Sequence, residues 1–263
     1  MNGIANAIAI ASGFCVLVGG LLYASQRKLL YPAPSAEVPE DLPVNVEKIA
    51  LPAGYGLLVK PRHASQTPMP LLIHAHGNAE LAFWSMQRFD ELLTRGFAVL
   101  LVEYPGYGGA AGKPSYESIR QAILSAYDEM VARPDIDSES IIAYGRSLGS
   151  GAVSVLVSER NLAALCLESA FSSLPLLVKE KGLPSFLLKD RFDNEAVVRS
   201  LDIPIFLYHG TQDTLIPIAH SEALAAAGKN VTFVRAHCGH NDCPRPWPEL
   251  IGFLDTIVPA VER

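Results

Sequence analysis

Ser147 is the middle residue of a Gly-x-Ser-x-Gly motif that spans 145–149 and directly follows an apolar run over 141–144. Small and apolar residues continue to Val157 at helical spacing, so the motif lies where a strand turns into a helix. Such a turn holds the serine on a strained backbone, and the two glycines let strand and helix pass close together. A random chain of this length carries the motif about one time in ten. The serine therefore needs partners elsewhere in the chain.

An acid and a base that could activate this serine also follow apolar runs. Asp213 comes shortly after the run 205–208, and His240 comes shortly after 231–236. A serine hydroxyl is too weak an acid to attack unaided, so a histidine must take its proton and a carboxylate must orient the imidazole. These residues predict acyl transfer with Ser147 as nucleophile, His240 as base and Asp213 as its orienting acid. Glu168 also ends an apolar run and is the rival partner for His240.

The elements that must position these residues alternate between strand and helix along the chain. The expected strands cover 44–51, 55–59, 71–75, 97–102, 141–144, 163–167, 205–208 and 231–236, and the expected helices cover 80–95, 115–132, 148–157, 217–227 and 246–258. This alternation forces right-handed crossovers and a mostly parallel sheet with helices on both faces. Ligands in such sheets bind at the carboxyl ends of the strands. We therefore predict an α/β fold with its site at that edge.

Several further motifs make the chain resemble the α/β-hydrolase family, in its small membrane-anchored abhydrolase-domain branch. They lie at 26–32, 76–79, 104–108, 145–149, 168–171, 190–193, 209–213 and 239–242. The resemblance implies the α/β-hydrolase fold, with a central sheet of about eight strands and the family's chain order of Ser, Asp and His. No large lid domain is expected, because the segment 171–200 is short. Pro105 and Glu80 depart from the pattern, which commonly has arginine and glycine there.

The tetrahedral intermediate of this chemistry needs preorganised hydrogen-bond donors for its oxyanion. We expect the backbone N–H of Leu148, at the start of the helix that follows Ser147, to be one donor. The backbone N–H of Asn78, in the His-Gly-Asn loop, is the expected second donor, and Ala79 is the alternative to it. No metal and no organic cofactor is implied.

The N-terminal segment has the composition of a membrane span. Residues 4–24 are apolar or small apart from Asn6 and Ser12, which is about the length that a bilayer needs. Arg27 and Lys28 follow and place the catalytic domain on the cytoplasmic side by the positive-inside rule. The predicted organisation is a transmembrane anchor or uncleaved signal over 1–25, a proline-rich linker over 26–43 and a hydrolase domain over 44–263.

Charge and cysteine usage exclude other classes of protein. The net charge is −6 and no long basic run occurs, so nucleic acid is not an expected partner. The 4 cysteines are too few for a disulfide scaffold. Cys238 and Cys243 flank His240, which raises a local disulfide or a zinc site, and chance proximity is the preferred interpretation. Of the remaining histidines we interpret His74, His76 and His209 as structural and His63 and His220 as surface residues.

The sequence thus predicts a membrane-anchored serine hydrolase that cleaves lipophilic carboxylic esters or acyl thioesters. Apolar residues between the strands could shape an acyl pocket or could be helical core: Leu174, Leu176, Leu177, Leu183, Phe186, Leu187 and Leu188. An aminopeptidase-like or amidase activity is the nearest alternative, and Glu80 and Glu103 are its only candidates for an amine-binding site. A non-catalytic binding protein is the third possibility, although such proteins typically lack one member of the triad.

Overall fold

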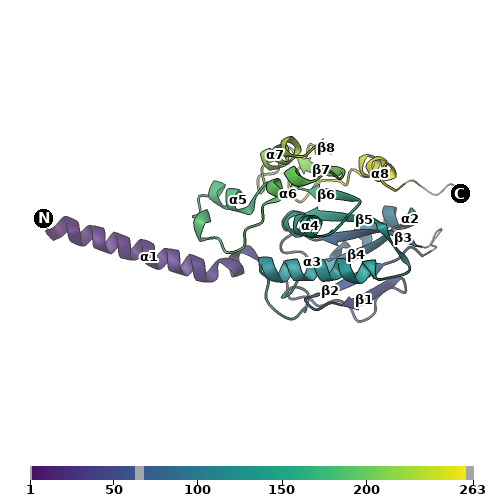
Figure 1. Cartoon of the computed structure of the whole chain (residues 1–263). Helices are drawn as coiled ribbons and strands as arrows, with labels where there is room; N and C mark the ends of the chain where they lie inside the picture. The colour runs from purple at the N-terminus through teal and green to yellow at the C-terminus, as the bar shows by residue number, and fades with distance from the viewer. Residues whose placement is uncertain (1, 63–67, 259–263) are drawn as a thin grey trace.

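The structure, a computed structural model, describes residues 2–62 and 68–258, and within the first helix the side chains at 10, 13, 14 and 16–30. Its centre is an 8-stranded sheet with the order β1-β2-β4-β3-β5-β6-β7-β8 (Figure 1). The strands are β1 (Val46–Ala50), β2 (Tyr55–Val59), β3 (Met69–Ala75), β4 (Ala98–Glu103), β5 (Ile136–Arg146), β6 (Ala164–Glu168), β7 (Ile205–Gly210) and β8 (Val231–Ala236). Strand β2 pairs antiparallel with β1 and β4, and all other pairs are parallel.

Two layers of helices cover this sheet. The helices are α1 (Asn2–Leu30), α2 (Asp90–Thr94), α3 (Tyr116–Val131), α4 (Leu148–Glu159), α5 (Leu174–Glu180), α6 (Asn194–Ser200), α7 (Ala219–Ala227) and α8 (Trp247–Asp255), with short 3₁₀ turns η1 (Ala82–Phe89) and η2 (Ser185–Leu187). The predicted fold class is confirmed. The helix expected over 80–95 differs, because its first half is the 3₁₀ turn η1 and only its second half is α-helical.

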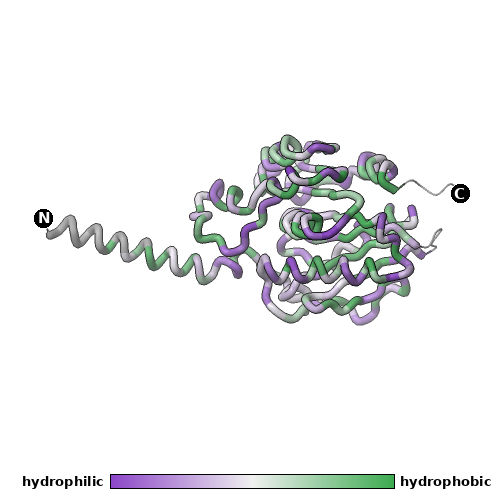
Figure 2. Tube along the Cα trace, viewed as in Figure 1, coloured by the Kyte–Doolittle hydropathy of each residue, from purple (hydrophilic) through white to green (hydrophobic). Residues whose placement is uncertain are grey.

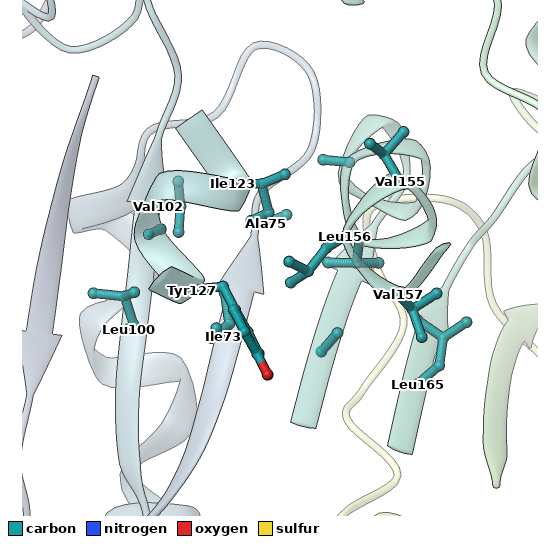
Figure 3. Close-up of a cluster of buried hydrophobic side chains, with 14 of the residues drawn as sticks. Ile73, Ala75, Leu100, Val102, Ile123, Tyr127, Val155, Leu156, Val157 and Leu165 are labelled. Atoms are coloured by element: carbon teal, nitrogen blue, oxygen red, sulfur yellow. The ribbon is translucent and has the colours of Figure 1, made fainter. Parts of the chain in front are cut away.

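Alternating side chains of the central strands supply a core on each face of the sheet. Leu71 and Ile73 of β3 pack with α3 and α4, whereas Leu72 lies on the opposite face with η1 and α8. Figure 3 shows the first of these cores, where Ile123 and Tyr127 of α3 lie beside β3 and β4. Figure 2 shows apolar and polar residues alternating along α3, as a helix with one buried face requires. Both faces of the sheet are therefore packed against buried apolar side chains.

The N-terminal helix corrects the predicted membrane anchor. Helix α1 extends away from the sheet (Figure 1). The described part of the chain contains no helix that is both long and apolar enough to cross a bilayer. Beyond the predicted span, Gln26 and Arg27 of α1 hydrogen-bond to the domain. The predicted single-pass anchor over 1–25 and the localisation derived from it are therefore wrong. Met1 lies outside the described residues.

Candidate active site

Ser147 stands on the sharp turn between β5 and α4. Its φ is 51° and its ψ is −116°, a left-handed conformation that a non-glycine residue adopts only under strain. The surroundings hold it there, because its N–H donates to the Glu168 carbonyl at 2.9 Å. A Cβ at Gly149 would collide with the Ala75 carbonyl, and a Cβ at Gly145 would collide with that of Gly149. The glycines thus allow α4 to lie against β3 and β5 and leave the serine at the carboxyl end of the sheet.

The structure brings the three candidate catalytic residues together. The Ser147 Oγ lies 3.1 Å from His240 Nε2, and His240 Nδ1 lies 2.7 Å from Asp213 Oδ2. The three residues come from different loops, which follow β5, β7 and β8 at the same edge of the sheet. Asp213 is 6% exposed and Ser147 is 7% exposed, so solvent competes little for these contacts. The arrangement can move a proton from the serine to the imidazole and hold the resulting positive charge.

Asp213 is itself fixed by its own loop and by a second histidine. Its Oδ1 accepts the N–H groups of Leu215 at 2.9 Å and Ile216 at 2.8 Å. His209 Nε2 lies 3.3 Å from Oδ2 of Asp213. Burial opposes ionisation of the carboxyl, but hydrogen bonds from His209 and His240 outweigh it and hold the pKa of Asp213 below its ordinary value. Sequence reasoning treated His209 as merely structural, and only its position four residues before Asp213 could have suggested this contact.

Glu168, the rival orienting acid, has other partners. Its Oε2 accepts the Tyr144 hydroxyl at 2.6 Å, and its Oε1 lies 3.3 Å from Arg146 Nε. Burial opposes its ionisation, but the charges of Arg245 and Arg146 hold the pKa of Glu168 below its ordinary value. The carboxylate is therefore neutralised within the protein instead of facing His240.

Arg146, the residue before Ser147, connects three loops at the site. Its guanidinium donates to Glu80 Oε1 at 2.5 Å, to the His240 carbonyl at 2.6 Å and to Asn241 Oδ1 at 2.9 Å. Glu80 in turn accepts the N–H of Gly77 at 2.9 Å with its other oxygen. The sequence singled out Arg146 and Glu80 separately. It gave no sign that they meet, because they are far apart in the chain.

The candidate oxyanion donors lie on two elements next to Ser147. Leu148 is the first residue of α4, so its N–H has no partner within the helix. The side chain of Asn78 donates to the Leu30 carbonyl at 2.5 Å and accepts the Tyr107 hydroxyl at 2.7 Å. The same Asn78 oxygen accepts the N–H of Ala79 at 3.1 Å. The Ala79 N–H, the alternative donor, is therefore already engaged.

The structure revises several interpretations of histidine and cysteine. Cys238 and Cys243 form a disulfide across the loop that carries His240, so chance proximity is wrong. His220 is buried, because its ring lies between Ser172 Oγ and Glu180 Oε2, each at 2.9 Å, and is not a surface residue.

His74 is buried as expected, but neither of its ring nitrogens has a hydrogen-bond partner among the described residues. Burial, with a smaller contribution from the charge of Arg245, holds the pKa of His74 well below its ordinary value. The ring is therefore neutral, and it packs edge-on against Phe89, with ring centroids 4.9 Å apart. His63 lies outside the described residues. Within those residues, no three His, Cys, Asp or Glu side chains form a group that could hold a metal ion.

Comparisons with known proteins agree with this architecture. The chain is 30% identical over 94% of its length to the uncharacterized protein Rv2307c of Mycobacterium tuberculosis, of which it covers 90%. It is 30% identical over 63% of its length to the alpha/beta hydrolase domain-containing protein WAV2 of Arabidopsis thaliana, of which it covers 63%. It is 28% identical over 61% of its length to human ABHD12B, of which it covers 50%. No family model matches the chain.

Two solved structures share the fold. The Pyrococcus furiosus esterase Pf2001 superposes with a TM-score of 0.68 at 17% identity, over 85% of this chain and 96% of that one. An acetyl xylan esterase from Paenibacillus sp. R4 superposes with a TM-score of 0.67 at 15% identity, over 90% and 94%. Given these relatives, the sheet order and the placement of its motifs, the chain belongs to the α/β-hydrolase family.

Proposed function

We propose that the protein is a serine hydrolase that cleaves carboxylic esters or acyl thioesters of lipophilic substrates through an acyl-enzyme on Ser147. The contact that carries this proposal is the relay from Ser147 Oγ through His240 to Asp213, with distances of 3.1 and 2.7 Å. Within the α/β-hydrolase fold, this arrangement serves acyl transfer.

In the proposed reaction, His240 Nε2 takes the proton of Ser147 as Oγ attacks the acyl carbonyl. The tetrahedral intermediate collapses, the bond to the leaving oxygen or sulfur breaks, and His240 returns the proton to it. A water then attacks the acyl-enzyme by the same steps and releases the carboxylic acid. Asp213 keeps the proton on Nδ1 of His240 and stabilises the imidazolium that forms twice in each cycle.

The backbone N–H groups of Leu148 and Asn78 are the proposed oxyanion donors. The position of Leu148 at the helix start supports the first, and the engagement of the Ala79 N–H by the Asn78 side chain supports Asn78 over Ala79. Such donors contribute about 3 kcal/mol each to the transition state in measured cases.

Two observations favour ester over amide substrates. Both acids that an amine-binding site would use have internal partners, since Glu80 holds Arg146 and the Gly77 N–H, and Glu103 is buried against His76 Nε2 at 2.9 Å. The two structural neighbours described above are named as esterases. The aminopeptidase-like alternative therefore lacks a free carboxylate at the two positions that suggested it.

A fluorophosphonate probe tests the proposal, because it reacts covalently only with an activated serine. The wild-type protein should be labelled and should hydrolyse p-nitrophenyl esters, whereas Ser147→Ala should do neither. Ser158→Ala, on the exposed side of α4, is the matched control and should behave like the wild type. A folded wild-type protein that neither reacts with the probe nor turns over any ester would contradict the proposal and favour a binding role.

A further inference from the structure

An apolar cavity of 180 Å³ lies between the C-terminal part of α1 and the segment that contains α5 and η2. We call it the α1–α5 cavity. Its main apolar walls are Leu22, Leu29 and Leu30 from α1 and Val178, Leu187 and Leu188 from the opposite segment. Figure 1 shows α5 beside the end of α1 where the helix joins the domain. The walls thus come from two parts of the chain that lie far apart in sequence.

This cavity is at the same edge of the sheet as the proposed active site. The segment with α5 and η2 follows β6, so it emerges from the carboxyl ends of the strands, as do the loops of Ser147 and His240. Leu30 touches the proposed oxyanion loop directly, because its carbonyl accepts the side chain of Asn78 at 2.5 Å. Leu30 is therefore both a wall of the cavity and a neighbour of the proposed oxyanion loop.

Polar contacts at the rim fix the two walls relative to each other. Arg27 of α1 donates twice to the Asp190 carboxylate, at 2.8 Å each, and Asp190 is 1% exposed. Gln26 donates to the Leu187 carbonyl at 3.0 Å and accepts the Lys189 N–H at 2.7 Å. These contacts between α1 and the opposite segment give the cavity a defined shape.

We propose that the α1–α5 cavity binds the acyl chain of the ester substrate, an inference that rests on the proposed function. Its six main wall side chains are aliphatic, so an alkyl chain gains burial there whereas a charged or sugar group would lose hydration. An apolar cavity of about 150 Å³ accommodates a benzene molecule, so this one has room for a medium-length alkyl chain. Every two methylene groups buried should raise kcat/KM about tenfold. Helix α1 is then part of the substrate site.

The test compares p-nitrophenyl acetate with p-nitrophenyl octanoate on the full chain. The wild type should prefer octanoate by at least about tenfold in kcat/KM. Val178→Trp and Leu29→Trp fill the cavity from opposite walls, and each should lower the octanoate-to-acetate ratio about tenfold. Leu176→Trp is the matched control, because Leu176 lies on α5 but is 40% exposed and does not line the cavity. Its ratio should equal that of the wild type.

The outcomes separate this inference from the proposed function. If acetate is hydrolysed and both filling variants keep the wild-type ratio, the cavity is not the acyl site, although Ser147 is still the nucleophile. An equal change in Leu176→Trp would likewise overturn the assignment, since that residue is outside the cavity. If neither ester is hydrolysed and the probe does not label Ser147, both proposals fail together. Leu29 is 68% exposed, so the fold should tolerate a tryptophan at this position. Leu29→Trp therefore tests the acyl-site assignment even if Val178→Trp does not fold.

Discussion

The guanidinium of Arg146 lies 2.5 Å from the carboxylate of Glu80, and this ion pair joins the nucleophile turn to the loop that carries Asn78. The Arg146 side chain is 6% exposed, so water screens the pair only weakly. The same guanidinium donates to the His240 carbonyl. One side chain therefore contacts the loops of the proposed nucleophile, base and oxyanion donor, and we regard Arg146 as a positioning residue.

Arg146→Lys should lower kcat about tenfold to a hundredfold and change KM much less. A lysine keeps the positive charge but lacks the planar group that contacts Glu80, His240 and Asn241 together. The loops should then lose their fixed spacing, and the transition state should lose stabilisation. Steady-state kinetics on a p-nitrophenyl ester, with the rate of probe labelling, measures the effect. Arg120→Lys, at an exposed pair with Glu159, is the control. A loss of kcat that simply follows a lowered Tm would argue for a structural role only.

Glu80→Gln should leave the ratio of ester to aminoacyl-amide hydrolysis unchanged. The glutamine oxygen can still accept the Gly77 N–H, and Glu80 is already committed to Arg146 in the native protein. We expect a severalfold lower rate on both substrates, because the ion pair is lost. The experiment compares the two rates side by side. A selective loss of aminoacyl-amide hydrolysis would instead assign Glu80 to substrate-amine binding.

Asp135 should make the stability of the fold depend on pH in the acid range. Hydrogen bonds from Arg133 lower the pKa of Asp135 to about 2. The pKa of Asp135 is thus lower in the folded chain than in the unfolded chain, where it is about 4. The ionised carboxylate therefore stabilises the fold fully at pH values above about 4, and this contribution is lost as the pH falls toward about 2. After allowance for solvent screening, Asp135→Asn should unfold about 1 kcal/mol more easily at pH 7.

Urea unfolding at pH 7, 4 and 2.5 measures this effect, and the gap between wild type and Asp135→Asn should shrink as pH falls. Asp202→Asn removes an exposed ion pair with Lys229 and should leave the unfolding free energy unchanged. A gap of constant size across the three pH values would show that Asp135 acts through packing and not through its charge.

The disulfide between Cys238 and Cys243 should support catalysis more than stability. It closes a short loop around His240, and short loops gain little from cross-linking in the chain-entropy account. The double variant Cys238→Ser with Cys243→Ser should lose kcat severalfold because the base is held less firmly. Its Tm should fall by only a few degrees. Cys166→Ser, at a buried free cysteine, is the control for kcat, and an unchanged kcat in the double variant would refute the idea.

The elements that were predictable from the sequence are those with local signals. Strands such as β3 are apolar on both faces, and the glycines around Ser147 mark a turn that only small residues permit. Ser147, Asp213 and His240 each follow a predicted strand, and the carboxyl ends of parallel strands share one edge of the sheet. Their positions in the sequence were therefore enough to predict that they lie at the same edge. Their mutual distances required the structure.

The features that the sequence missed are contacts between distant side chains. Arg146 meets Glu80 across 66 residues and Arg27 meets Asp190 across 163, and no local pattern encodes such a pairing. Composition likewise misled at the N-terminus, where the described part of the chain has no helix long and apolar enough to cross a bilayer. Burial of His220 between Ser172 and Glu180 depends on the same tertiary packing.

The contacts of α1 bear on where a shortened version of this protein can begin. The division at residue 44 is still a prediction, but Tyr31 is 3% exposed and the Pro34 carbonyl accepts the N–H of Gly108. A chain started at Val44 would leave the buried Asp190 without its arginine and Asn78 without the Leu30 carbonyl. Recombinant expression should therefore retain the chain from Leu22 onward, so that Arg27 and Leu30 keep these contacts with the domain.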